Sequence, residues 1–169
     1  WANDRLIPDS IRAWANNDIL TIRNPNATRP WQHVLEPLSG YLHVGSELIK
    51  RNKRCKNESF NFGPDASVNK TVEEVLQEMS KSWENVKWKV ESNPMQHKEA
   101  GLLKLCCDKA HHYLNWYPTL DFKTTIQFTM HWYKMFYAKD DSYNVKDFTG
   151  NQIESYIEHA EKKQIEWTR

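Results

Sequence analysis

One arginine is a candidate anion ligand because of the residues on its C-terminal side. Arg29 precedes a stiff Pro-Trp pair, and the stretch VLEPLSGYL then places apolar residues at steps of three and four, as one face of a helix does. Pro37 is tolerated in a first helical turn, so we expect the helix to begin near Glu36. A guanidinium close to unpaired helix N–H groups suits a phosphate. A surface arginine in a loop is the alternative interpretation.

Other residue types that could do chemistry form no recognisable catalytic or metal-binding pattern. The sequence has no G-x-G-x-x-G or G-x-x-G-x-x-G stretch, no phosphate-binding G-x-x-x-x-G-K, and no convincing Tyr-x-x-x-Lys pair. His111 and His112 are adjacent and point about 100° apart on a helix, which argues against a shared metal ion. Cys106 and Cys107 are interpreted as a buried strand pair rather than as a reactive thiol.

Composition bounds the class of protein. The 169 residues are 39% hydrophobic and 12% aromatic, which is enough for one domain with a core. A net charge of +1 predicts no nucleic-acid partner and no anionic membrane surface, and no apolar run approaches the roughly 20 residues of a membrane-spanning helix. Three cysteines without zinc spacing favour a reduced, cytoplasmic protein. The first residue is Trp, so we expect the sequence to start inside a longer chain.

Hydrophobic periodicity predicts alternating helices and short strands, hence a small mixed α/β domain. Helices are expected over residues 5–15, from about 36 to 49, over 71–83, over 108–116, from about 120 to 137, and from 149 onward. Strand character is found in 19–25, 86–90 and 100–107, with a short apolar-alternating run in 59–64. Thr71 with Glu74, and Thr149 with Gln152, fit capping boxes, and Asp108 is the expected cap of its helix.

Two helices carry apolar faces that need partners. The inner face of the helix after Glu36 is expected to consist of Val34, Leu35, Leu38, Tyr41, Leu42, Gly45, Leu48 and Ile49. The helix of residues 120–137 has a second aromatic face, made by Phe128, Trp132 and Phe136. We expect a missing domain or another subunit to cover this second face.

Several stretches together carry a family resemblance. WANDRLIPDSIRAW, IRNPNATRPWQHVLEPLSGYL, FNFGP, LKLCCDKAHHYLNWYP and the later WYK resemble the C-terminal half of the CDP-glucose 4,6-dehydratases, from Trp1 to about Tyr156. These enzymes are extended short-chain dehydrogenases/reductases of the NAD(P)-binding Rossmann superfamily. RNPNATRPWQHVLEPLSGYL is the most specific stretch, because the wider nucleotide-sugar superfamily shares only its arginine and the general helix.

The resemblance implies a fold and a function. Residues 1–169 would form the mainly helical, nucleotide-sugar-binding C-terminal lobe, with elements near 1–35 and 58–64 completing a Rossmann domain whose main half, with its bound NAD, is absent from this chain. The family oxidises C4 of CDP-glucose, eliminates water across C5 and C6, and returns the hydride to C6, in deoxysugar (O-antigen and lipopolysaccharide) biosynthesis. The full-length enzyme is expected to be a homo-oligomer. The alternatives are a non-catalytic nucleotide-sugar-binding or assembly module, or a related nucleotide-sugar epimerase or dehydratase.

The resemblance also implies site residues. Arg29 matches an arginine that grips the sugar-nucleotide diphosphate, and Asn61 matches an asparagine that reaches the same phosphates. The remaining substrate-binding residues by resemblance are Arg5 and Leu6 against the nucleotide, Ile22 and Arg23 near base and ribose, and Lys98. Lys98 stands where the family usually has His, in Lys98-Glu99-Ala100. The catalytic and cofactor-binding residues belong to the absent half, and no metal ligand is implied.

We predict that this chain alone neither binds NAD nor converts CDP-glucose, because it has no dinucleotide-binding turn and no catalytic pair. The measurement is product formation and NAD binding by the purified 169-residue chain. Formation of the 4-keto-6-deoxy product would contradict the prediction.

Overall fold

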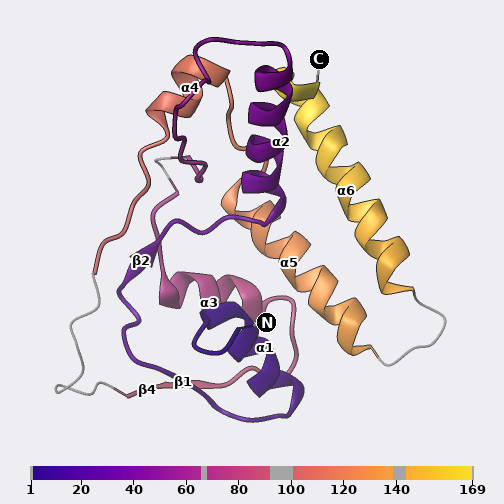
Figure 1. The fold of residues 1–169 in the computed structure, drawn as a ribbon. Helices are drawn as coiled ribbons and strands as arrows, with labels where there is room; N and C mark the ends of the chain where they lie inside the picture. The colour runs from indigo at the N-terminus through magenta and orange to yellow at the C-terminus, as the bar shows by residue number, and fades with distance from the viewer. Residues whose placement is uncertain (1, 66–67, 92–100, 139–143, 169) are drawn as a thin grey trace.

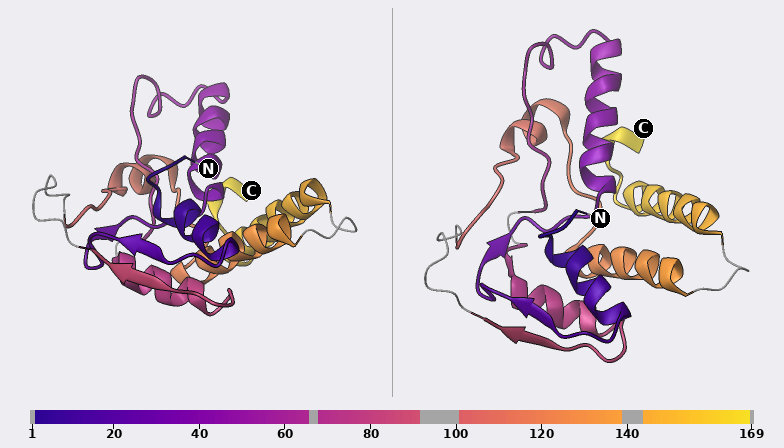
Figure 2. Two further views of the ribbon diagram at one scale, coloured as in Figure 1. Left: turned by 90° about the horizontal axis from the view of Figure 1, so that it is seen from below. Right: turned by 60° about the horizontal axis from the view of Figure 1, so that its bottom comes forward.

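A computed structural model describes residues 2–65, 68–91, 101–138 and 144–168. Its elements are, in order, α1 (Leu6–Ala15), β1 (Leu20–Ile22), β2 (Thr28–Arg29), α2 (Leu35–Ile49), β3 (Lys70–Thr71), α3 (Val72–Ser80), β4 (Trp88–Val90), α4 (Asp108–Leu114), α5 (Phe122–Tyr137), α6 (Val145–Lys162) and the short helix η1 (Glu166–Thr168). The strands and helices α1 and α3 gather at one end of the molecule, and α2 and α4 stand at the other (Figures 1 and 2).

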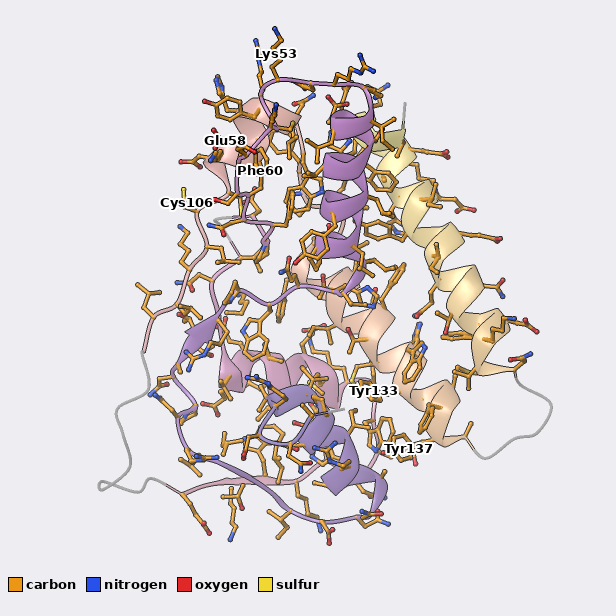
Figure 3. The ribbon with its side chains drawn as sticks, viewed as in Figure 1. Lys53, Glu58, Phe60, Cys106, Tyr133 and Tyr137 are labelled. Atoms are coloured by element: carbon orange, nitrogen blue, oxygen red, sulfur yellow. The ribbon has the colours of Figure 1, made fainter. Side chains whose placement is uncertain are left out.

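The strand-bearing end is built around one apolar core. β1 pairs with β4 in parallel and β2 pairs with β3 in antiparallel fashion, so the described residues hold two two-stranded sheets. Helices α1, α3 and α5 close over them, and Tyr133 and Tyr137 of α5 pack on the same core from the side of α1 (Figure 3). The fully buried members of this core are Ile11, Trp14, Leu20, Ile22, Val75, Leu76, Met79, Ile126 and Met130.

Local sequence signals account for several of these elements. Thr71 and Glu74 form the predicted capping box, with the Thr71 hydroxyl accepting from Glu74 N at 3.1 Å and Glu74 accepting from Thr71 N at 2.8 Å. α2 begins at Leu35, one residue from the predicted start. The expected strands in 19–25 and 86–90 are confirmed as β1 and β4.

Three local predictions are wrong: the start of one helix, the cap of another and the presence of one strand. α6 begins at Val145, because Asn144 caps it by accepting from Lys146 N; Thr149 instead donates its hydroxyl to Val145 O inside the helix. Cys107, not Asp108, occupies the N-cap of α4 and makes no side-chain bond there. Within the described part of 100–107 no strand forms, and pairing is limited to an isolated bridge between Thr28 and Leu102.

The second aromatic face of α5 is covered within the chain, contrary to expectation. α6 packs along it: Gln152 donates to Phe128 O at 2.7 Å, and the Trp132 indole N–H donates to the Thr149 hydroxyl at 2.9 Å. The Phe128 ring meets His159 edge to face. Only Phe136 among the three aromatic residues stays largely exposed.

The orientation of α2 is opposite to the prediction. Its buried residues are Glu36, Ser39, Gly40 and His43, which form a polar face. Most of the apolar face points to solvent instead, with Leu42 76% and Ile49 84% exposed. Leu35 is half-buried and Gly45 borders open space; the others that lie exposed are Val34, Leu38, Tyr41 and Leu48.

Glu36 explains the orientation, because its buried carboxylate bonds two other helical segments. It accepts from the backbone N–H of Thr119 at 2.9 Å and of Leu120 at 2.6 Å, just before α5, and from the Tyr156 hydroxyl of α6 at 3.0 Å. One helical turn later, Ser39 accepts from the Trp116 indole N–H at 3.1 Å. Burial raises the pKa of Glu36, and the hydrogen bonds it accepts oppose this rise.

Replacing Glu36 by Ala should lower the free energy of unfolding by at least about 2 kcal/mol, since two buried backbone N–H groups lose their acceptor and each orphaned group costs roughly 1–3 kcal/mol. The Tyr156 hydroxyl keeps Ser39 Oγ as an acceptor at 3.1 Å. Glu36→Gln keeps an acceptor for the two N–H groups, and its amide can donate to the Tyr156 oxygen, so it should stay within about 1 kcal/mol of wild type. Urea unfolding measures both. Glu154→Ala, at an exposed acid of α6, is the matched control, and equal losses for Glu36→Ala and Glu154→Ala would refute this role of Glu36.

His33 should make the protein acid-sensitive. Burial lowers its pKa from 6.5 to about 4, its ring meets Phe128 edge to face, and its Nδ1 accepts from Leu35 N at 3.4 Å. The unfolded chain therefore takes up a proton that the folded chain refuses, so stability is full above pH 6.5 and falls toward pH 4, by at most about 1.4 kcal/mol per pH unit. His33→Asn keeps an acceptor but cannot titrate. Urea unfolding between pH 4 and 7 should show a shallower slope for this variant, and identical slopes would exclude the effect.

Candidate functional site

Five of the residues assigned to substrate binding line one cavity of about 310 Å³. Its lining residues come mainly from the start of α1, from strand β1 and from strand β2. Figure 1 shows these elements at the strand-bearing end of the molecule. The five are Arg5, Leu6, Ile22, Arg23 and Arg29. They come from three separate segments of the chain, and the fold brings them together.

Each arginine has a fixed place in the local structure. Arg5 is the N-cap residue of α1, Arg23 follows β1, and Arg29 ends β2. The Arg29 guanidinium donates to Thr28 O at 2.8 Å, which holds the side chain along its own strand. Arg29 also lines a second, small recess of about 10 Å³ together with Lys104. The sequence patterns did not assign Lys104 to the site.

Two carboxylates share the cavity with the arginines, and neither was predicted. Asp4 lies 3.5 Å from Arg23, and Asp9 forms an ion pair with Arg12 of the same helix. Both aspartates are close in sequence to Arg5, so their proximity is the one signal that could have pointed to them. The lining thus combines three arginines with two aspartates, which leaves an excess of positive charge for an anion.

The helix terminus beside the arginines belongs to α1, not to α2 as the sequence suggested. No residue of α2 lines this cavity, whereas Arg5 and Leu6 at the start of α1 do. Arg5 makes no side-chain cap bond, so no N-cap side chain occupies that terminus of the described helix. A helix N-terminus carries partial positive charge, which adds to the field of the three guanidinium groups.

Two assigned residues lie elsewhere. Asn61 is exposed and donates to Cys106 O at 3.2 Å, and it does not line the cavity. Its chain neighbour Phe60 and Cys106 lie near α4 (Figure 3). The Asn61 amide is therefore used in joining the segment before Pro64 to the segment before α4. Lys98 falls outside the described residues.

The cavity also has apolar walls. Leu6, Ile22 and Val72 line it together with Trp31, whose indole N–H donates to Lys70 O at 2.8 Å and so fixes the ring. Arginines on one side and apolar side chains on another can bind a ligand that has both an anionic and a flat apolar part.

The described ranges hold neither a three-residue metal-ligand group nor a helix able to cross a membrane. Residues 2–65, 68–91, 101–138 and 144–168 hold no group of three His, Cys, Asp or Glu side chains placed to bind a metal ion. Across the same ranges, no helix combines the length and hydropathy needed to cross a membrane.

Comparison with known proteins confirms the resemblance. The chain is 41% identical over 142 residues to the CDP-glucose 4,6-dehydratase of Salmonella typhimurium (strain LT2), a match that covers 83% of the chain and 39% of that enzyme. The chain therefore spans about two fifths of the length of this curated relative. No family model matches the sequence.

The fold is also found in a solved structure. The UDP-N-acetylglucosamine 4-epimerase from Bacillus cereus superimposes with a TM-score of 0.54 at 15% identity, over 79% of this chain and 44% of the epimerase. This likeness concerns the fold alone. The predicted mixed, helix-rich architecture with few short strands is confirmed, and it is shared with part of that epimerase chain.

Proposed function

We propose that this chain is the nucleotide-sugar-binding part of a CDP-glucose 4,6-dehydratase and that the cavity between α1, β1 and β2 holds the diphosphate. The observation that carries the proposal is the convergence of Arg5, Arg23 and Arg29 on that cavity, in a chain 41% identical to such an enzyme. Arg29 is the one of these residues that both its own sequence neighbourhood and the family resemblance single out, and it lines the same cavity.

The chemistry of the cavity suits a nucleoside diphosphate sugar. A diphosphate carries two negative charges, and a planar guanidinium can bond two of its oxygens at once. Arg29 and Arg5 approach from β2 and from the start of α1, Asp4 lies beside Arg23, and Asp9 is paired with Arg12 of α1, which is outside the cavity lining. Trp31 and Val72 offer an apolar wall to ribose or base.

This assignment divides the work of the enzyme. The chain would bind and orient the sugar nucleotide and shield it from water. NAD, which takes up the hydride from the sugar and gives it back, would be held by the other part of the enzyme, because the sequence of this chain has no glycine-rich dinucleotide turn. The overall conversion of CDP-glucose to the 4-keto-6-deoxy sugar, its place in deoxysugar biosynthesis, the cytoplasmic location and homo-oligomerisation belong to the same proposal.

Arg29→Lys should weaken CDP-glucose binding by about one to two orders of magnitude, because an ammonium cannot reproduce a bidentate contact worth roughly 1.5–3 kcal/mol. Titration calorimetry or ligand-observed NMR gives the affinity, and calorimetric melting gives the stability. Arg54→Lys, an exposed arginine in the loop after α2, is the control and should leave the affinity unchanged. Unchanged affinity of Arg29→Lys, or a lower melting temperature with affinity retained, would mean that Arg29 is structural.

A further inference from the structure

The loop that follows α2 holds the highest density of positive charge in the sequence. Its residues 50–56 read KRNKRCK, so five of the chain's 23 cationic residues lie there, and no acidic residue does. The other 18 lysines and arginines are outnumbered by the 22 acidic residues. The net charge of +1 thus conceals a basic loop on an otherwise acidic chain, and net charge alone does not decide whether this loop meets an anion.

The charges of the basic loop are not neutralised within the chain. Glu47, which precedes the loop, is paired with Lys50 at 3.1 Å. Glu58, which follows the loop, is paired with Lys109. The other four cations of the loop are exposed and form no ion pair with an acid in the part of the chain that the structure describes: Arg51, Lys53, Arg54 and Lys56. Like charges repel each other, so an approaching anion stabilises the loop.

Hydrogen bonds hold the basic loop in a defined shape. The N–H groups of Arg51 and Asn52 donate to carbonyls of the last turn of α2 at 3.0 and 2.9 Å, which ends the helix in a Schellman motif. The Asn52 amide donates to the Glu47 carboxylate at 2.7 Å, and its oxygen accepts from Arg54 N at 3.0 Å. Cys55 is 2% exposed and anchors the loop in an apolar cluster that includes residues of α4. The backbone that carries the cations is therefore fixed before a ligand arrives, which lowers the entropic cost of binding.

Arg51 occupies a backbone position at which glycine is the usual residue. Its φ is 59°, in the left-handed region, at the position after the C-cap where helices most often use glycine. Elsewhere among the described residues, positive φ falls on Asn and Asp, which tolerate it, and on Gln164. The macrodipole of α2 does not explain the cations further along the loop, because its effect falls off within the last turn. A cation kept against the preference of the backbone indicates a use outside the fold.

The basic loop lies at the tip of the molecule. Figure 1 shows it at the far end of α2, opposite the strand-bearing end with the cavity between α1, β1 and β2. In Figure 3 the Lys53 side chain projects outward from this tip. A flat surface can meet the loop there and leave the cavity open to its ligand.

We propose that the basic loop, residues 50–56, is a docking surface for a membrane that contains anionic phospholipids. Clusters of four to eight Lys and Arg bind anionic headgroups, with about a fivefold gain in partitioning per cation near the surface. Residues 50–56 contain no aromatic side chain on which a nucleic-acid base could stack, and their one apolar side chain is the buried Cys55. A specific protein partner would need an exposed apolar anchor, whereas headgroups need only charge.

The proposed contact is electrostatic and reversible, with the protein resting on the headgroups. It goes beyond the proposed function, which needs no membrane. The cytoplasmic location included in that proposal would place the negatively charged cytoplasmic leaflet within reach.

The test is sedimentation of the full-length protein with vesicles made of phosphatidylglycerol and phosphatidylcholine in equal parts, and with vesicles of phosphatidylcholine alone. The protein should sediment only with the anionic vesicles. Raising the ionic strength from about 0.1 M to about 1 M should release it, because the Debye length falls from about 10 Å to about 3 Å.

Loss of two loop cations should weaken the binding strongly. Lys53→Gln combined with Arg54→Gln should lower the partition coefficient about 25-fold, as expected for two cations at about fivefold each. Lys87→Gln combined with Lys134→Gln is the matched control, since it removes the same charge at two exposed lysines outside the loop, and it should sediment as wild type does.

Arg51→Gly separates membrane binding from folding. Glycine adopts a φ of 59° without strain, so the melting temperature of this variant should equal or exceed that of wild type. Its partition coefficient should nevertheless fall about fivefold.

Equal sedimentation with both kinds of vesicle would overturn the proposal, and so would wild-type partitioning of the Lys53→Gln, Arg54→Gln variant or an equal loss in the lysine control. A protein that ignores both vesicles but binds polyglutamate through the same two residues would assign the loop to an acidic protein and also overturn it. The affinity for CDP-glucose should be unchanged in every loop variant, so failure here is distinguishable from failure of the proposed function.

Discussion

A buried carboxylate at the start of α2 sets the arrangement of the helical end of this molecule. Glu36 accepts from two backbone N–H groups ahead of α5 and from a tyrosine of α6, so it joins three helices at one point. Lys163, just after α6, adds a further bond by donating to Thr119 O at 2.6 Å. Because these bonds can form only with the polar side of α2 inward, its apolar side has to point away from the core. The exposed apolar face of α2 is a consequence of this one constraint.

The sequence predicts local elements well where the signal is short-range. The capping box at Thr71 and Glu74 and the start of α2 near Pro37 depend on residues within one turn. The second expected box, at Thr149, fits the same pattern, but Asn144 offers an earlier cap and the helix continues back to it. Periodicity located the apolar face of α2 correctly and could not say what covers it, because the bonds to Glu36 come from residues more than 80 positions away.

In the candidate site, too, local sequence signals identify single residues, whereas contacts between distant segments decide which residues come together. Arg29 could be singled out from its own neighbourhood, and Arg5, Leu6, Ile22 and Arg23 only through family resemblance. That these residues line one cavity depends on how α1, β1 and β2 pack together, which no local pattern encodes. Asp4 and Asp9 were missed because isolated acidic residues near a helix start are common on protein surfaces. Asn61 was placed by resemblance alone, and in the structure its amide bonds the backbone of Cys106 instead.

The central claim is that this chain binds a nucleotide sugar between α1, β1 and β2. The most direct measurement is a titration of CDP-glucose into isotope-labelled chain, monitored through the backbone amide signals in a two-dimensional NMR spectrum. We expect shifts concentrated at Leu6, Ile22 and Arg29, with unchanged signals of Leu42 and Ile157, which line a groove between α2 and α6. Shifts confined to that groove, or no shifts at all at saturating CDP-glucose, would contradict the claim.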